Sequence, residues 1–404
     1  MIYIKKKLSI DGLNISKLAK KFNTPLYCYS YKKLNENISS IKNNFKKINP
    51  LICFAVKSNT NLKILKEIKK FNLGADVVSI GELMKVLKAG IKPQKIVFSG
   101  VGKTKTEIEY AINKKILLIN AESKSEILEI EKIAKSKKRK INIGIRLNPN
   151  TDAKTLNQIS TGKKENKFGV DEKTFLGLVS YVKRSKNLNL KCLSVHIGSQ
   201  ILDNQPYSKM LSVINKVIKK AKHTFEYIDL GGGIGIDYVH NKDKFNLKKY
   251  SLNIQKFLEK NNSKIIFELG RSIIGNTAIL VSKIIYIKKG YKKDFVILDS
   301  AMNDLIRPAL YNAEHKIIPL RKNKINSKKT YEFVGPICES TDKFSTLKNF
   351  QKLSQKELIV ICDVGAYGIS LSSNYNLRPK PIELLINKSK VKIISKRQNL
   401  KDLM

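Results

Sequence analysis

The sequence predicts an α/β fold, a (β/α)8 TIM barrel with a second, mostly antiparallel β-domain. Three observations predict it. Short apolar runs alternate with helix-like stretches up to Asn276, polar side chains follow the ends of most runs, and beyond Asn276 strand-like runs follow one another without regular helices. Short buried strands that alternate with helices are typical of parallel pairing, and eight such units can close a barrel. An open, doubly wound sheet is the alternative on this pattern.

Eight short apolar runs predict the barrel strands, and amphipathic stretches between them predict the helices. The runs lie at 51–56, 75–78, 95–100, 116–120, 141–147, 192–197, 227–230 and 265–269. Apolar residues recur at intervals of three and four over 61–71, 81–90, 104–115 and 122–136. We therefore predict that the barrel occupies residues 31–275.

The predicted β-domain combines both ends of the chain. Strand-like runs cover 278–289, 294–300, 331–337 and 357–368, and the N-terminal segment contains another at 25–30. No low-complexity linker separates these parts from the barrel. We expect residues 1–30 to join residues 276–404 in this domain.

Length and composition favour a globular protein of the cytoplasm. The chain has 404 residues, of which 42% are hydrophobic, and it contains no apolar run of 18 residues that would predict a transmembrane helix. The N-terminus, MIYIKKKLSIDG, lacks the apolar run of a secretory signal. The five cysteines form no C-x-x-C pair, which argues against a disulfide framework or a structural zinc site. We expect no metal and no membrane partner.

A formal net charge of +45 raises the alternative of a nucleic-acid or anionic-membrane partner. Only eight of the 78 basic residues are arginine, and the lysines are spread along the whole chain. A dedicated nucleic-acid protein more often concentrates its charge and uses arginine for forked contacts. We interpret the charge as a solvated surface and expect no specific nucleic-acid partner.

Polar residues lie within or just after the predicted barrel strands. Asp76 stands at the start of its strand, with Ser79 just beyond the end, and the others are Lys57, Arg146, His196, Ser199, the glycines at 231–233, Glu268 and Arg271. In a barrel of this kind the carboxyl ends of all strands meet at one mouth, where such enzymes hold their active sites. We therefore expect these residues to gather there although they lie far apart in the sequence.

Three of these features together indicate pyridoxal phosphate. A lysine such as Lys57, placed at a strand end among small residues, can supply a nucleophilic amine that attaches a carbonyl cofactor. The run GGGIG exposes backbone N–H groups that can hold a phosphate. A carboxylate such as Glu268 can keep a pyridine nitrogen protonated. Taken singly, each has a plainer interpretation: a paired lysine, a tight turn or a surface ion pair.

Eight segments, spread over nearly the whole chain, carry a resemblance to a known family. They are FAVKSNTNLKIL (54–65), GADVVSIGEL (74–83), SVHIGSQ (194–200), DLGGGIGI (229–236), ELGRSI (268–273), DSAMNDLIRPALY (299–311), GPICESTD (335–342) and DVGAYG (363–368). With these segments the chain resembles the diaminopimelate decarboxylases, which are alanine-racemase-like (fold type III) pyridoxal phosphate enzymes. One departure is Leu269, at a position where this family usually has proline.

The resemblance implies a role for each matching residue. Lys57 would attach the cofactor and His196 would stack on its ring. The remaining cofactor contacts would come from Asp76, Ser199, Gly232, Gly233, Glu268, Gly270, Arg271 and Tyr367. The distal, L-configured end of the substrate would bind Arg271, Arg307, Tyr311, Glu339 and Tyr367.

The resemblance also implies a homodimer with shared active sites, because Cys338 and Glu339 would reach the site from the second subunit. Cys338 would protonate the substrate carbon, with the amine of Lys57 as its rival. A buried thiol that serves only as a small apolar group is the plainer interpretation of Cys338. We count Lys57, Cys338 and His196 as the catalytic residues.

The implied activity is that of a carboxy-lyase that converts meso-2,6-diaminopimelate at its D-centre into L-lysine and CO2, the last step of lysine biosynthesis. The alternatives are a related decarboxylase of ornithine, arginine, lysine or carboxynorspermidine, and a non-catalytic homologue. Glu339, together with Arg307 and Tyr311, favours a substrate with a distal carboxylate, whereas diamine-forming relatives usually carry Asp after the cysteine. A non-catalytic homologue is not expected to retain Lys57, Glu268 and Cys338 together.

Overall fold

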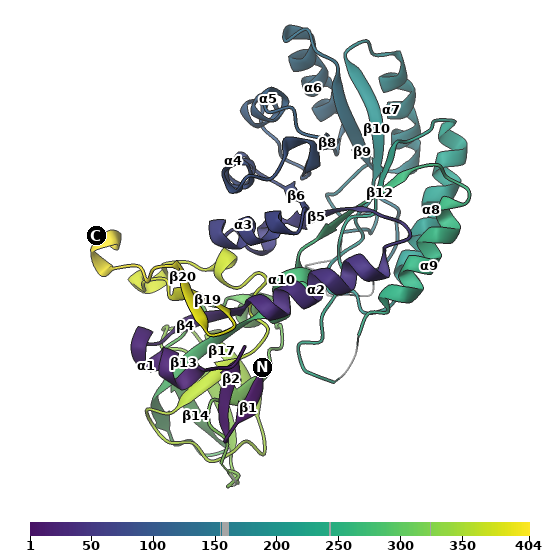
Figure 1. Cartoon of the computed structure of the whole chain (residues 1–404). Coiled ribbons are helices and arrows are strands. Elements are labelled where there is room, and N and C mark those ends of the chain that lie inside the picture. The colour runs from purple at the N-terminus through teal and green to yellow at the C-terminus, as the bar shows by residue number, and fades with distance from the viewer. Residues whose placement is uncertain (154, 156–160, 242–243, 324) are drawn as a thin grey trace. The chain divides into compact units, whose positions relative to one another are not determined.

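The computed structural model describes residues 1–153, 155, 161–241, 244–323 and 325–404 (Figure 1). The chain divides into two compact units. The barrel unit comprises Ile38–Ile236 and Asp243–Ser272, and the β unit comprises Met1–Asn37, Asp237–Lys242 and Ile273–Met404. The domain limits expected from the sequence, 31–275 for the barrel and 1–30 with 276–404 for the β-domain, remain a prediction.

The barrel unit is built on a closed barrel of parallel strands in the order β10-β11-β12-β5-β6-β7-β8-β9. The strands are β5 Leu51–Ala55, β6 Gly74–Val77, β7 Ile96–Phe98, β8 Leu118–Ala121, β9 Ile141–Arg146, β10 Leu188–Ser194, β11 Tyr227–Asp229 and β12 Lys264–Leu269. The barrel predicted from the sequence is confirmed, and the open sheet is wrong. Leu269, which stands in place of the expected proline, is buried and pairs with Phe54 across β12 and β5.

Helices on the outside of the barrel begin where the sequence supplies a cap. Ser79, Thr104 and Ser123 each precede a helix, and each accepts a hydrogen bond from the backbone N–H of the glutamate three residues later. Such caps satisfy N–H groups that a helix start leaves without partners. The helices of this unit are α3 Leu62–Lys70, α4 Ile80–Ala89, α5 Lys105–Asn113, α6 Lys124–Ser136, α7 Glu172–Arg184, α8 Gln205–Ala221 and α9 Leu247–Leu258.

The barrel interior changes from apolar to polar toward the carboxyl ends of the strands. A cluster of Cys53, Val97, Leu118, Cys192 and Ile266 fills the apolar layer. Two residues beyond Leu118 and Ile266, on the same strands, are the buried polar side chains Asn120 and Glu268. Buried polar groups need hydrogen-bond partners, so this second layer organises the site described below.

The β unit contains a nine-stranded, mostly antiparallel sheet with the path β17-β16-β14-β13-β4-β19-β20, and β18 joins β13 to β15. Its strands are β4 Leu26–Ser30, β13 Ala278–Lys288, β14 Lys293–Leu298, β15 Ile317–Pro319, β16 Thr330–Val334, β17 Lys343–Leu347, β18 Leu358–Ile361, β19 Ile382–Asn387 and β20 Lys390–Ser395. The expected β-domain is confirmed, including its N-terminal strand. A small sheet of β1 Ile2–Ile4, β2 Lys7–Ile10 and β3 Leu13–Asn14 precedes it.

The N-terminal strand β4 lies inside this sheet and pairs with β13 on one side and β19 on the other. Leu26 and Cys28 of β4 pack with Ile279, Val281 and Val360 in a common core. Further helices of the chain are α1 Ile15–Phe22, α2 Tyr31–Asn44, α10 Arg271–Ile274 and α11 Arg307–Tyr311. No helix in the described part of the chain is long and apolar enough to cross a membrane.

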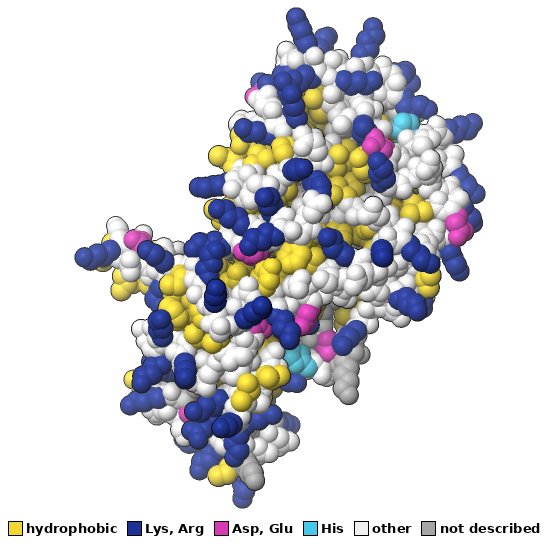
Figure 2. All heavy atoms as spheres, in the orientation of Figure 1, with side chains coloured by type: hydrophobic (Ala, Val, Ile, Leu, Met, Phe, Trp, Pro, Cys, Tyr) yellow, Lys and Arg dark blue, Asp and Glu magenta, His cyan; other side chains and the backbone are white. Residues whose placement is uncertain are grey.

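The surface view matches the interpretation of the net charge. Figure 2 shows Lys and Arg side chains spread over the visible face, with few Asp and Glu among them and no single cluster of basic residues. Such an arrangement is that expected of a solvated, strongly basic surface.

Candidate active site

Lys57 lies directly after β5, in a short 3-10 turn over Val56–Ser58. Its Nζ lies 3.1 Å from Oδ2 of Asp76, which is fully buried on the neighbouring strand β6. The side chain of Lys57 is 38% exposed. The turn therefore carries the amine out of the apolar strand and places it beside a buried carboxylate.

Two further carboxyl groups lie in the same polar layer, on β11 and β12. Glu268 accepts a hydrogen bond of 2.8 Å from Ser99 Oγ. Asp229 accepts hydrogen bonds from Asn120 Nδ2 at 3.0 Å and from the Gly231 N–H at 2.9 Å. Asn120 Nδ2 also lies 3.3 Å from Ser99 Oγ, so these side chains form one network.

The electrostatics of this layer favour an incoming cation. Burial, followed by the neighbouring charges of Asp229 and Asp76, raises the pKa of Glu268 well above its usual range. Burial likewise raises the pKa of Asp229 to about 6. Oδ1 of Asp76 is buried and has no hydrogen-bond partner among the described residues. A protonated ring nitrogen beside Glu268 would supply charge that this layer lacks, so the carboxyl groups fit a pyridinium.

The glycines after β11 form a cradle of bare backbone. Gly231 and Gly233 have positive φ angles of 63° and 94°, which L side chains rarely adopt. A Cβ at Gly232 would lie 2.0 Å from the Glu268 carbonyl oxygen, and one at Gly233 would lie 2.3 Å from that of Gly198. Only glycine fits these positions, and the chain here can approach an anion closely. The cradle therefore fits a phosphate group.

The imidazole of His196 is held in its neutral form. Its Nδ1 accepts a hydrogen bond of 3.1 Å from the Gly232 N–H, so Nε2 carries the proton of the neutral ring. Burial, and then the charges of Arg146 and Lys57, lower the pKa of His196 well below its usual range. Arg146 is itself paired with Glu122 at 3.0 Å. A neutral, fixed ring suits a stacking contact.

Arg271 and Ser199, both expected at the site, contact each other in the barrel unit. Nε and Nη2 of Arg271 donate to Ser199 Oγ at 3.3 and 2.9 Å. Gly270, beside Arg271, has no room for a side chain, since a Cβ there would lie 2.8 Å from Ser58 Oγ. The structure thus brings Lys57 into one mouth with the other expected residues of this unit: Asp76, His196, Ser199, Gly232, Gly233, Glu268, Gly270 and Arg271.

Sequence reasoning missed three members of the polar network, namely Ser99, Asn120 and Asp229. Each is a polar residue inside or just after an apolar run, in KIVFSG, ILLIN and YIDL. A buried strand rarely carries such a residue without a partner. That signal could have identified all three residues.

In the β unit, Arg307 begins α11 and is buried, and Tyr311 at the end of that helix is partly exposed. Nη1 of Arg307 lies 2.6 Å from Nε2 of His315. Its guanidinium carbon lies 4.4 Å from the centroid of the Tyr238 ring. Arg307 is therefore fixed by side chains that sequence reasoning did not single out.

The segment GPICESTD is a loop fastened by one buried carboxylate. Asp342 accepts hydrogen bonds from the N–H groups of Met302 at 2.7 Å and Ile337 at 2.8 Å. The following residues, Cys338 and Glu339, are exposed. This exposure argues against the buried-thiol interpretation of Cys338.

The remaining expected residues of the β unit are Glu339 and Tyr367. Glu339 accepts hydrogen bonds from Tyr375 Oη and, at 3.2 Å, from Thr341 Oγ1. Tyr367 is partly exposed and has a φ angle of 57° in the turn that follows β18. Gly365 in the same turn leaves no room for a Cβ, which would lie 2.0 Å from the Ile274 carbonyl oxygen.

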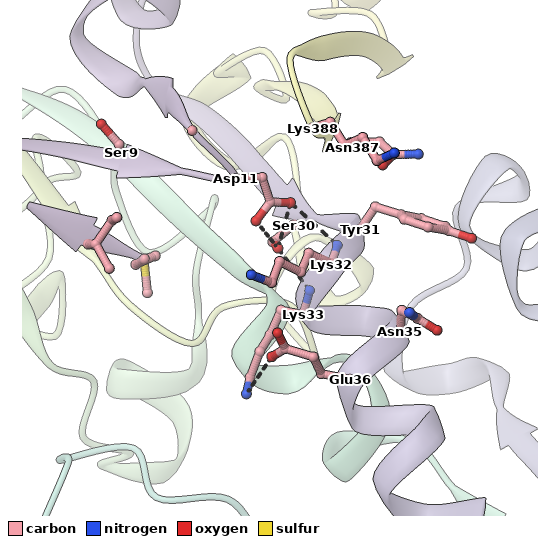
Figure 3. A pocket seen from close by; sticks show the side chains of 13 residues that line it. Ser9, Asp11, Ser30, Tyr31, Lys32, Lys33, Asn35, Glu36, Asn387 and Lys388 are labelled. Atoms are coloured by element: carbon pink, nitrogen blue, oxygen red, sulfur yellow. Dashed lines mark hydrogen bonds and ion pairs between the residues drawn. The ribbon is translucent and has the colours of Figure 1, made fainter. Parts of the chain in front are cut away.

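The β unit also contains a hollow lined by residues of its N-terminal segment, of α2 and of the turn after β19 (Figure 3). Asp11 points toward Ser30 and accepts hydrogen bonds from its Oγ at 2.8 and 2.9 Å and from the Lys32 N–H at 3.3 Å. Lys33 and Glu36 pair across one turn of α2 at 3.5 Å. These polar groups satisfy one another, so we assign no ligand here. Among the described residues, no group of three or more His, Cys, Asp or Glu could hold a metal ion.

Comparison with known proteins shows which proteins this chain is similar to. Residues 31–275 match the family model of the pyridoxal-dependent decarboxylases, pyridoxal binding domain. The diaminopimelate decarboxylase of Helicobacter pylori (strain J99) is 42% identical over 393 residues, which are 96% of this chain and 97% of that protein. That of Aquifex aeolicus (strain VF5) is 39% identical over 397 residues, 97% of this chain and 94% of that protein.

A solved structure shows the same similarity. The crystal structure of diaminopimelate decarboxylase from M. jannaschii in co-complex with L-lysine has a TM-score of 0.93 and 33% identity to this chain. The match covers all of this chain and 96% of the other.

Proposed function

The chain belongs to the family of pyridoxal-dependent decarboxylases, and from this premise we infer that it removes CO2 from the D-centre of meso-2,6-diaminopimelate to give L-lysine. The observation that carries the proposal is the charge arrangement at the barrel mouth. There the amine of Lys57 faces Asp76, and the pKa of Glu268 is raised by burial. The choice of substrate rests on relatives that are similar to this chain over nearly its whole length.

The residues of the mouth suit pyridoxal phosphate as the cofactor. When bound, this cofactor supplies a conjugated ring that accepts the electron pair left on the substrate carbon as CO2 departs. Lys57 provides the amine that attaches it. The backbone of Gly232 and Gly233 binds the phosphate, with Ser199 beside it. Glu268 holds a proton on the pyridine nitrogen, and His196 presents a neutral ring for stacking.

The remaining residues then bind the substrate and move a proton. Arg307 and Arg271 carry fixed guanidinium groups that suit a distal carboxylate. Tyr311 and Tyr367 complete the polar contacts, and Glu339 binds the distal ammonium. Cys338 donates the proton that replaces CO2 on the substrate carbon, or the Lys57 amine does so.

Cys338 and Glu339 act, in this proposal, at the site of a second copy of the chain, so the enzyme is a homodimer. Exposure of both residues supports this assignment. Tyr375, which donates to Glu339, and nearby Leu377 are also exposed, and Leu377 has a φ angle of 52° that is unfavourable for leucine. An apolar side chain held outward in this way suits a subunit contact.

We also propose that the enzyme acts in the cytoplasm. All five cysteines are free thiols in the structure, and four of them are buried. Free thiols persist in a reducing compartment.

The test is an assay of the purified protein for CO2 and lysine formation from meso-diaminopimelate, with ornithine and arginine in parallel. Lys57→Ala serves as the inactive control. We expect a yellow protein that releases both products from diaminopimelate alone. Faster release of CO2 from ornithine or arginine would instead identify a sister decarboxylase, and a colourless, inactive protein would identify a non-catalytic homologue.

A further inference from the structure

His315 holds the guanidinium of Arg307 in the interior of the β unit. Nη1 of Arg307 lies 2.6 Å from Nε2 of His315, and Nδ1 of His315 lies 2.8 Å from the carbonyl oxygen of Cys362. His315 is 3% exposed and Arg307 is 5% exposed. The histidine thus connects Arg307 to the end of β18.

The two contacts define the proton on the ring. An arginine can only donate, so Nε2 must accept from Arg307 and carries no proton. A carbonyl oxygen can only accept, so Nδ1 must carry the proton and donate to Cys362. His315 is therefore a neutral imidazole that accepts at one end and donates at the other.

Tyr238 fixes the other side of Arg307. The guanidinium carbon lies 4.4 Å from the centroid of its ring, a cation–π distance. The ring also meets that of His315 edge to face, with centroids 5.0 Å apart. Backbone hydrogen bonds join the segments that carry these residues. The Lys316 N–H donates to the Tyr238 carbonyl oxygen at 3.1 Å, and the Cys362 N–H donates to the Lys316 carbonyl oxygen at 2.9 Å. Three segments of the β unit therefore converge on one guanidinium.

We propose that His315 and Tyr238 are positioning residues that fix Arg307 for the distal carboxylate of the substrate, and that they thereby set the preference for a substrate with two carboxylates. This inference rests on the proposed function. A free arginine side chain has many rotamers, and holding it in advance lowers the entropy lost when the carboxylate binds. The pair contributes to binding and not to the chemical step.

Two substitutions at His315 separate its two contacts. His315→Gln places an amide oxygen near the position of Nε2, so it retains an acceptor for Arg307. His315→Asn places an amide N–H near the position of Nδ1, so it retains the donor to Cys362 but loses the acceptor. Both variants carry a side-chain amide, so a difference in kinetics between them reports the contact with Arg307.

The measurement uses the holoenzyme and two ligand pairs that differ by one carboxylate. For turnover these are meso-diaminopimelate and D-lysine, and for inhibition they are L-lysine and cadaverine. For His315→Asn we expect a rise of about tenfold in the KM for diaminopimelate and in the inhibition constant of L-lysine, the effect of one charged contact. The kcat for diaminopimelate and all values for D-lysine and cadaverine should change by less than about threefold. His315→Gln should resemble the wild type.

Substitutions of Tyr238 provide an independent test of the proposal. Tyr238→Phe keeps the ring over Arg307 and should behave as the wild type, whereas Tyr238→Leu should raise the KM for diaminopimelate by about threefold to tenfold. Melting temperature and cofactor absorbance show that each variant is folded and loaded.

Equal losses for both members of a ligand pair, or equal losses in His315→Gln and His315→Asn, would overturn the proposal and leave His315 with a structural role. A wild-type protein that does not decarboxylate diaminopimelate would refute the proposed function instead. The affinities for L-lysine and cadaverine would in that case still test whether His315 acts through Arg307 on a carboxylate.

Discussion

The amine of Lys57 lies 3.1 Å from the buried carboxylate of Asp76, across the gap between β5 and β6. The other oxygen of Asp76 has no hydrogen-bond partner in the described part of the chain. Lys57 therefore has two functions: it pairs with a buried carboxylate, and it offers a nucleophilic amine.

Two substitutions of Lys57 separate these functions. Lys57→Arg keeps a cation beside Asp76 but has no amine that can attach a carbonyl, and Lys57→Ala removes both. We expect both variants to lose borohydride-reducible attachment of pyridoxal, and Lys57→Arg to remain closer to the wild type in melting temperature. Lys191→Ala, at a surface pair with Glu226, is the control and should retain attachment. Full attachment in Lys57→Arg would mean that another lysine carries the cofactor.

Asp229 predicts a pH dependence of stability. Its pKa is raised to about 6 by burial, above the ordinary value of 3.8, so the folded chain binds the proton more tightly than the unfolded chain. Stability contributed by the protonated form is present below about pH 4 and is lost as the pH rises through about 6. Asp229→Asn cannot ionise and escapes this loss. In cofactor-free protein, its melting temperature relative to wild type should rise between pH 4 and pH 8, by on the order of 5 °C.

The control for this pH dependence is Asp294, whose pKa is lowered by its contacts with Lys289 and Lys329 although burial opposes them. Asp294→Asn should lose stability relative to the wild type as the pH rises toward the ordinary value of 3.8, which is the opposite sign, and the difference should change little between pH 4 and pH 8. A pH-independent difference between Asp229→Asn and wild type would show that the pKa of Asp229 is the same in the folded and the unfolded chain.

Substitution by alanine should be harmful at Gly233 and favourable at Gly177. A Cβ at Gly233 meets the Gly198 carbonyl at 2.3 Å in a backbone with a φ angle of 94°. Gly233→Ala should therefore weaken cofactor binding at least tenfold, measured by absorbance titration. Gly177 lies in α7 with no atom within 4 Å of its Cβ position, and alanine there should stabilise by about 0.5–1 kcal/mol. Unchanged cofactor affinity in Gly233→Ala would remove this glycine from the phosphate site.

Arg307→Ala tests the substrate assignment directly. A charged hydrogen bond to a carboxylate contributes about 1.5–3 kcal/mol, and more when it is buried. We expect kcat/KM for meso-diaminopimelate to fall by about 10²–10³, and that for D-lysine, which lacks the distal carboxylate, to fall much less. The two substrates are compared on one preparation. An equal fall for both would assign Arg307 to the fold or to the cofactor.

Mixing two inactive variants tests the shared site. Lys57→Ala and Cys338→Ala, mixed after mild dissociation, should recover up to about a quarter of wild-type activity. Random pairing makes half of the dimers mixed, and each mixed dimer has one intact site of two. Native mass spectrometry should verify that the subunits have exchanged. No recovery after such exchange would place Lys57 and Cys338 in the site of one chain.

The sequence by itself determined the local structure of this protein and the chemical type of its site. The alternation of apolar runs and amphipathic stretches predicted the barrel, and a serine or threonine three residues before a glutamate marked the start of α4, α5 and α6. Lys57 and the glycines at 231–233 could be recognised because their features are local, namely a strand end and a run of adjacent glycines. Such features depend on neighbouring residues, which a sequence displays directly.

Only the tertiary structure decided which polar groups meet. Ser99 and Glu268 are 169 residues apart and form a hydrogen bond because the closure of the barrel brings β7 and β12 to one mouth. Tyr238 and His315 both contact Arg307 because the fold brings three segments of the β unit together there. The exposure of Lys57 and the raised pKa of Glu268 depend on these distances and on burial. Charge interactions and desolvation depend on separation in space, and a linear sequence does not contain that separation.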